Sequence, residues 1–172
     1  MKAYLLYKGE EHYSFLKPVL DLLPQKGREF DYVLLSLQAS PLNLEFDDLL
    51  NRSYEKPIII KGNQLVDYIN EEDCQFIFGA VIAYPKGKVP NLTCKVLDPE
   101  IECLEFEKLL VSLFNSKDKP IFVFNPFDST NTTMLFSDEE IMKKYLKRYP
   151  SAIERKFLKD GSLDVPKESW IE

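Results

Sequence analysis

Polar side chains are concentrated in one loop, Asn125 to Thr133, which follows a short apolar run. Within nine residues the loop offers one carboxylate, four hydroxyls and two amides. In open α/β sheets, ligands bind beyond the carboxyl ends of the strands. The sequence therefore predicts that a polar site for a small molecule, or for catalysis, would lie around Asp128, Ser129 and Asn131.

Three other loops follow predicted strands and would reach the same edge of the sheet if those strands were parallel. They are Ser36 to Asn43, Lys61 to Gln64, and Tyr84 to Lys88. In that arrangement Ser36 and Lys61 would line one pocket together with Asp128 and Ser129. The alternative is that these side chains only bond their own backbone, because any turn-rich loop has such a composition.

A second group of candidate residues is acidic. No base interrupts its five members, which are Asp98, Glu100, Glu102, Glu105 and Glu107. Such a cluster raises the rate of association with a basic protein. Glu100, Glu102 and Glu105 are therefore predicted to bind a basic partner. The alternative is that the cluster only keeps the protein soluble, as would the smaller groups elsewhere in the chain.

The residues that usually hold metals or act as nucleophiles are sparse. The chain has three cysteines, Cys74, Cys94 and Cys103, and one histidine, His12. An odd number of cysteines without a Cys-x-x-Cys spacing is typical of reduced thiols in the cytosol. Four zinc ligands cannot be assembled at local spacing, and no acidic stretch fits an EF-hand loop. We therefore expect no metal site and name no catalytic residue.

The glycines exclude the common nucleotide-binding motifs. The six glycines form neither G-x-G-x-x-G nor the phosphate-cradling G-x-x-x-x-G-K. There is also no Gly-x-Ser-x-Gly or His-Glu-x-x-His. The sequence therefore predicts no cofactor. Whether the protein is an enzyme stays open, although the absence of these motifs favours a non-catalytic protein.

The charge balance bears on partners and location. With 22 basic and 28 acidic residues the net charge is -6, which argues against nucleic-acid binding. No apolar run approaches the roughly 20 residues of a membrane span. The first apolar residues are followed at once by Lys8 and Glu10, so no export signal is expected. These features predict a cytoplasmic protein with neither nucleic acid nor membrane as partner, and they leave the oligomeric state open.

Apolar periodicity predicts the elements that would position these residues. Strands are expected at 2–7, 30–37, 57–60, 75–84, 93–97, 120–124 and 134–136. Helices are expected at 11–23, 46–50, 64–70, 99–115, 138–148 and 151–159. Pro18 would start or bend the first helix, and a strand over 101–106 competes with the fourth. Gly79 indicates a bulge or a close approach, and Ser137 with Glu140 indicates a capping box.

Buried strands that alternate with helices favour an α/β fold. We expect a single layered domain with a mixed sheet of about five to six strands, flanked by helices. The hairpin expected at 76–97 argues against a purely parallel sheet, because the strands of a hairpin are antiparallel. An α+β arrangement is the alternative. Residues 1–160 would form the domain and residues 161–172 a C-terminal tail that carries Trp170.

Two functions of different class follow from these features. The first is a non-catalytic cytosolic protein-binding domain that uses acidic and aromatic surface. The second is a small-molecule-binding domain or small enzyme built around Asp128 and Ser129. In composition the chain resembles single-domain accessory proteins, including the immunity proteins that neutralise toxins, and this resemblance assigns no site residue.

Overall fold

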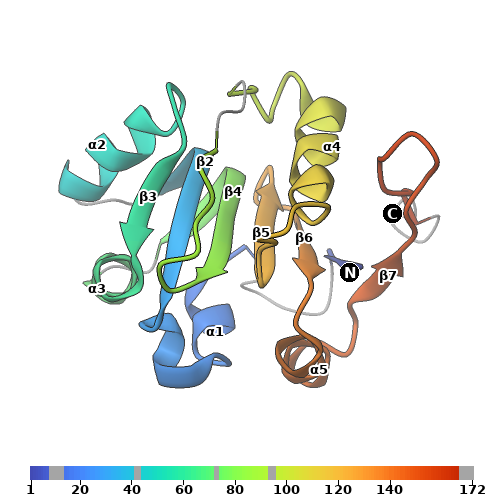
Figure 1. The fold of residues 1–172 in the computed structure, drawn as a ribbon, viewed down its shortest axis with the longest axis horizontal. Helices are drawn as coiled ribbons and strands as arrows, with labels where there is room; N and C mark the ends of the chain where they lie inside the picture. Colours follow the sequence, from blue (N-terminus) through green and yellow to red (C-terminus); the bar gives the residue numbers. More distant parts are fainter. Residues whose placement is uncertain (8–13, 41–43, 72–73, 93–95, 167–172) are drawn as a thin grey trace.

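The computed structural model describes residues 1–7, 14–40, 44–71, 74–92 and 96–166 (Figure 1). Its centre is one seven-stranded sheet with the order β3-β2-β4-β5-β6-β1-β7. The strands are β1 (Lys2–Leu6), β2 (Phe30–Ser40), β3 (Ile58–Lys61), β4 (Gln75–Pro85), β5 (Phe122–Phe127), β6 (Asn131–Phe136) and β7 (Ile153–Arg155). Every pair of neighbouring strands is antiparallel.

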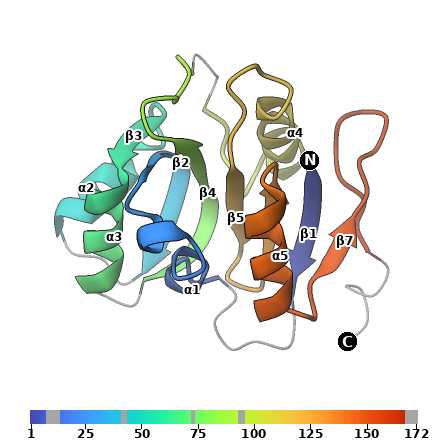
Figure 2. The same cartoon turned by 60° about the horizontal axis from the view of Figure 1, so that its bottom comes forward.

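Helices lie on both faces of the sheet. They are α1 (Lys17–Leu20), α2 (Leu44–Arg52), α3 (Gly62–Glu71), α4 (Cys103–Leu113) and α5 (Glu139–Arg148), with a short 3₁₀ turn, η1 (Pro24–Gly27). Figure 2 shows α1, α3 and α5 in front of the sheet and α4 behind it. Among the described residues, no helix is both long and apolar enough to cross a membrane.

The two faces of the sheet bury different apolar clusters. One cluster joins alternate strand residues such as Tyr32 and Leu34 to apolar side chains of α1, α2, α3 and α5. The other joins their neighbours Val33 and Leu35 to α4. The partly buried side chains packed against it include Val89, Leu92, Val96 and Leu97. The continuous apolar runs of the sequence are explained by this burial on both faces.

The prediction of mixed helix and strand content is confirmed, but the expected sheet is wrong in two respects. The sheet has seven strands rather than five or six, and it is antiparallel rather than mixed. This arrangement is closer to the α+β alternative. The additional strand is β7, which spans three residues where a helix was expected at 151–159. Such a short edge strand depends on its pairing with β1 and leaves no pattern of its own.

Several predicted boundaries also change. The helix expected at 11–23 is reduced to α1, which has Pro18 in its first turn, and residues 8–13 of this prediction lie outside the described residues. The helix expected at 99–115 begins only at Cys103. The strand expected at 93–97 is not formed by residues 96–97, while 93–95 lie outside the described part of the chain.

The start of α5 differs from the predicted capping box. Asp138, not Ser137, is the N-cap, and its carboxylate accepts a hydrogen bond from the Ile141 amide at 2.9 Å. The Ser137 hydroxyl instead donates to the Pro120 carbonyl at 2.5 Å. Both residue types can cap a helix. The Ser137 hydroxyl is already bonded to Pro120, just before β5, so Asp138 is the cap.

The residues after Arg155 fold back onto the domain. Leu163 is buried in the cluster beneath α4, and its neighbour Ser162 is buried as well. The first residues of the predicted tail therefore pack against the domain, and the boundary at residue 160 stays a prediction. Residues 167–172 of the predicted tail, with Trp170, lie outside the described residues.

Candidate functional site

A β-bulge near the end of β2 creates the site. Between the Leu35–Ala80 and Gln38–Phe78 pairs, β2 supplies two residues opposite the single Gly79. Because side chains alternate along a strand, one extra residue moves the next side chain to the other face. Leu37 accordingly joins the α2 side of the core, although Leu35 belongs to the α4 side.

Only glycine fits opposite this bulge. Gly79 has φ +98°, and a Cβ atom there would overlap the Ser36 carbonyl oxygen. Ser36 also has a positive φ, +46°, and its hydroxyl donates to the Leu97 carbonyl at 2.7 Å. The Asn125 amide donates to the Gly79 carbonyl at 2.7 Å. The bulge predicted at Gly79 is thus confirmed. Hydrogen bonds with Leu97 and Asn125 hold it in place.

The residue after α2 fastens that helix to the bulge. The Ser53 hydroxyl accepts a hydrogen bond from the Leu37 amide at 2.8 Å and donates to the Leu50 carbonyl at 2.6 Å. The Ser53 carbonyl accepts from the Ser36 amide at 3.0 Å. Ser53 is fully buried, so these bonds fix the distance between the end of β2 and α2.

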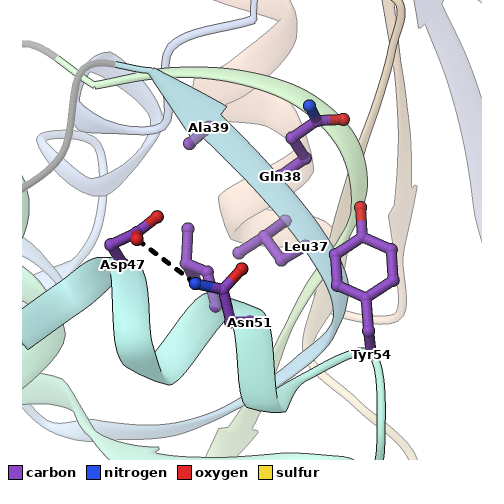
Figure 3. A pocket seen from close by; sticks show the side chains of 7 residues that line it. Leu37, Gln38, Ala39, Asp47, Asn51 and Tyr54 are labelled. Atoms are coloured by element: carbon purple, nitrogen blue, oxygen red, sulfur yellow. Dashed lines mark hydrogen bonds between the residues drawn. The ribbon is translucent and has the colours of Figure 1, made fainter.

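Between the end of β2 and α2 lies a pocket of about 220 Å³ (Figure 3). Its buried floor is apolar and consists of Leu37 and Leu50. Its rim is polar, and the seven lining residues are Leu37, Gln38, Ala39, Asp47, Leu50, Asn51 and Tyr54. One of them is acidic and none is basic, so the lining favours a cationic group.

Hydrogen bonds arrange the polar rim. The Asn51 amide nitrogen donates to a carboxylate oxygen of Asp47 at 3.2 Å, one helical turn away. This bond leaves the Asn51 carbonyl oxygen on the rim as an acceptor. The Tyr54 ring closes the other side of the opening, as Figure 3 shows. Carboxylate, amide oxygen and phenol therefore surround one apolar floor.

The Tyr54 ring also connects the pocket to the acidic cluster. Burial raises the pKa of the Tyr54 phenol, and the carboxylates of Asp98 and Glu100 raise it further. The phenol therefore stays protonated at neutral pH and can both donate and accept hydrogen bonds. The pocket and the turn that begins at Asp98 form one negatively charged region.

The predicted acidic residues have different roles in this region. The Asp98 carboxylate accepts the Glu100 amide at 2.9 Å, and the Glu102 carboxylate accepts the Asp98 amide at 3.1 Å. These bonds shape the turn before α4, in the manner of a capping box. The Glu105 carboxylate lies on the exposed side of α4, 3.2 Å from Lys108. Of the three predicted binding residues, Glu100 and Glu105 are exposed and Glu102 is half-buried.

The fifth acid of the cluster is bound inside the molecule. Glu107 forms an ion pair with Arg155 at 2.6 Å, and the two side chains are only 16% and 7% exposed. The other Glu107 oxygen accepts the Leu163 amide at 2.8 Å. Arg155 also donates to the carbonyls of Leu163 and Asp164 and to the Thr133 hydroxyl. This carboxylate therefore holds the C-terminal segment and is not available to a partner.

Two large apolar side chains stand beside the exposed acids. Ile101 is 79% exposed in the turn before α4, and Leu104 is 50% exposed on the first turn of the helix. The backbone at Ile101 is held in place, because its amide donates a hydrogen bond to the Asp98 carboxylate at 3.4 Å. An ordered turn thus presents apolar and acidic side chains together.

The loop predicted around Asp128 is the tip of the β5–β6 hairpin. Asp128 and Ser129 have φ +50° and +54°, and the Thr130 amide donates to the Phe127 carbonyl at 3.1 Å. Two positive φ values in succession are the mark of a type I′ turn. Asp128 is exposed, and Asn131 begins β6 with its amide 3.4 Å from the Thr130 hydroxyl. The site predicted around Asp128, Ser129 and Asn131 thus lies at a hairpin turn and stays a prediction.

The predicted convergence of four loops is wrong because the strands are antiparallel. Lys61 and Tyr84 both lie beside Asp31, near the beginning of β2, whereas Ser36 lies towards its end. Lys61 instead forms an ion pair with the buried Asp31 at 3.1 Å. The structure does join Ser36 to the Asn125 loop, through Gly79. Lys61 cannot share a pocket with Asp128 in this topology.

Other predicted sites can be placed as well. Cys74 is buried and Cys103 is exposed, while His12 and Cys94 lie outside the described residues. Within the described ranges, no three His, Cys, Asp or Glu side chains are grouped to hold a metal ion. The pocket residues Gln38, Asn51 and Tyr54 were not predicted. The only signals were Gly79 and the i, i+4 spacing of Asp47 and Asn51.

Comparisons of the chain with protein-family models, with curated proteins and with solved structures gave no match. The site is therefore interpreted from its own geometry.

Proposed function

We propose that this chain is a non-catalytic, cytoplasmic protein-binding domain of the accessory, inhibitor or immunity type. It binds a basic protein through the acidic and apolar surface formed by Tyr54, Glu100, Ile101, Leu104 and Glu105, which we call the acidic face. The observation that carries this proposal is the 79% exposed Ile101 on a hydrogen-bonded turn between acidic residues.

The energetic roles divide between the two kinds of side chain. Burial of Ile101, Leu104 and the Tyr54 ring would favour binding by about 25 cal/mol per Å² of apolar surface before the entropic costs of association are subtracted. The carboxylates of Glu100 and Glu105 would steer a basic partner and set its orientation. Because the turn is already ordered, binding would cost little conformational entropy.

The buried polar groups support a structural role rather than chemistry. Ser36, Ser53 and Asn125 hold the bulge, and Arg155 holds the C-terminal segment. Each of these side chains is committed to backbone atoms of its own chain. An exposed face is then the part of the molecule that remains for a partner.

Affinity capture from native lysate tests the proposal with four baits. They are the wild type, the apolar variant Ile101→Ser/Leu104→Ser, the charge variant Glu100→Gln/Glu105→Gln, and the control Glu139→Gln/Glu140→Gln. Glu102 is left intact because it bonds the Asp98 amide. The control removes the same charge from α5, where Glu139 and Glu140 pair with Lys143 and Lys144.

We expect one basic protein to be recovered with the wild type and the control and to be depleted with both acidic-face variants. Recovery should also fall as salt is raised, because exposed charges are screened. The proposal is wrong if every captured protein is recovered equally with all four folded baits, or if the control loses it as well.

A further inference from the structure

The pocket beside the acidic face has a size and a lining that specify its occupant. Sites for drug-sized ligands occupy about 300–1,000 Å³. The pocket measures about 220 Å³, which suits a single amino-acid side chain better than a cofactor. Its apolar floor of Leu37 and Leu50 suits a methylene stem, and the Asp47 carboxylate on its rim suits a cationic end.

We infer that this pocket receives an arginine side chain of the basic partner, with the guanidinium at Asp47, Asn51 and Tyr54. The inference rests on the proposed function, since the same partner would cover the acidic face. No covalent step is involved. The occupant is bound by hydrogen bonds, charge and packing alone.

Arginine fits this lining better than lysine does. A guanidinium is planar and presents five N–H donors, so it can bond the Asp47 carboxylate and the Asn51 carbonyl at once. Its plane can stack on the Tyr54 ring. A lysine ammonium has three donors on a compact charge and is more strongly hydrated. Arginine is also enriched among the residues that dominate binding at protein interfaces.

The position of Tyr54 supports a single continuous surface. Tyr54 lines the pocket, and its phenol lies in the field of Asp98 and Glu100 from the turn before α4. Tyr54 thus lines the pocket together with Asp47 and also interacts electrostatically with the exposed Glu100. A basic segment seated on the acidic face would pass the pocket opening, where one of its arginines could enter.

The bulge gives the pocket a fixed shape before any partner binds. Ser53 bonds the Leu37 amide and the Leu50 carbonyl, and these two residues form the floor. The floor therefore needs no rearrangement to accept a side chain, which lowers the cost of binding.

NMR titration of the ¹⁵N-labelled chain tests the inference without the partner. The probes are N-acetyl-arginine-N-methylamide and its uncharged isostere N-acetyl-citrulline-N-methylamide. We expect the arginine probe to shift the amides of Gln38, Ala39, Asn51 and Tyr54, with saturation at about millimolar concentration. The citrulline probe should bind at least about threefold more weakly, and added salt should narrow the difference.

A matched pair of variants assigns the effect to the pocket. Asp47→Asn should weaken the arginine probe about threefold while keeping an acceptor for Asn51. Asp48→Asn is the control, because Asp48 directly follows Asp47 in α2 but pairs with Arg52 at 3.9 Å and does not line the pocket. The spectrum of each free variant reports whether it is folded.

Equal binding of the two probes, shifts confined to other residues, or an unchanged affinity in Asp47→Asn would each overturn the inference. These outcomes would leave the acidic face to be judged by the capture experiment alone. Conversely, if capture fails while the arginine probe binds as expected, the acidic face is wrong as the partner surface, and only the affinity of the pocket for an arginine side chain stands.

Discussion

Glu107 on α4 and Asp47 on α2 are both helical carboxylates, but they have opposite surroundings. Glu107 is 16% exposed and is bound by Arg155 and the Leu163 amide. Asp47 is exposed on the rim of a pocket whose lining contains no base. The comparison shows that burial in an ion pair withdraws Glu107 from any partner, whereas an exposed carboxylate such as Asp47 stays accessible.

The two carboxylates should also differ in what their mutation changes, stability in one case and binding in the other. Removing one member of a buried ion pair leaves an unpaired charge away from water, which is costly. Removing an exposed carboxylate changes stability little, although it can change binding. The Glu107 region should therefore respond to mutation through folding, and the Asp47 region through recognition. The predictions below test that division.

The largest effect is expected for Arg155→Met. The variant leaves Glu107 and two backbone carbonyls without their donor, so we expect a loss of about 3–5 kcal/mol in the free energy of unfolding. Urea denaturation measures it, and hydrogen exchange at Leu163 should accelerate. The double variant Glu107→Met/Arg155→Met should recover the part of the loss that comes from the unpaired charge, but not the part that comes from the Leu163 and Asp164 carbonyls, which still lack their donor. A single variant as stable as the wild type would show that the C-terminal segment is not held by this pair.

Gly79→Ala should be nearly as harmful. The new methyl would overlap the Ser36 carbonyl at a positive φ, so we expect about 3 kcal/mol of destabilisation. Gly87→Ala is the matched control, since Gly87 also has a positive φ, +71°, but has no atom within 4 Å of a Cβ. Its cost should be about 1 kcal/mol. Equal thermal stabilities for the two variants would contradict the packing of the bulge.

Ser53→Ala should have a smaller effect that reaches the pocket. The substitution leaves the buried Leu37 amide without its acceptor, which costs about 1–2 kcal/mol. The arginine probe should also bind more weakly, because α2 is no longer fixed to β2. Ser112→Ala serves as the control, since that hydroxyl bonds an exposed carbonyl of α4. A Ser53 variant that matches this control in stability and in probe binding would refute the role of Ser53.

The smallest effect concerns an exposed pair on α5. A hydrogen bond from Lys143, at 2.8 Å, lowers the pKa of Glu139 below its ordinary value. The contribution of the Glu139–Lys143 pair to stability is therefore complete at a pH above the ordinary pKa of a glutamate. It is lost as the pH falls through the lowered pKa of Glu139. NMR titration should show the pKa of Glu139 rising to its ordinary value in Lys143→Met. Its global stability at neutral pH should not change measurably.

The sequence predicts the elements better than their arrangement. The runs at 30–37 and 75–84 are buried on both faces, as their continuity indicates, and both become strands. The expected mixed sheet was wrong, because apolar continuity indicates burial and does not tell whether neighbouring strands are parallel. The expected convergence of the other loops on Asp128 depended on parallel strands, so that part of the prediction failed with the sheet.

The acidic cluster shows a second limit of sequence. The five acids between 98 and 107 have no base among them, yet Lys108 and Arg155 pair with two of them in the fold. Arg155 is 48 residues from Glu107, a separation at which charge patterns give no information. Only exposure then separates Glu100 and Glu105 from Glu107. The pocket was not predicted for a related reason. Its floor residue Leu37 faces α2 only because of the bulge in β2, which depends on pairing with β4.

The most direct test of the central claim is the association rate of the captured partner as a function of salt, measured by stopped flow with the wild type and Glu100→Gln/Glu105→Gln. We predict that the variant associates about three- to tenfold more slowly at low salt, and that the two rates converge as salt rises. Equal rates and equal salt dependence for the two proteins would contradict the claim that the acidic face meets the partner.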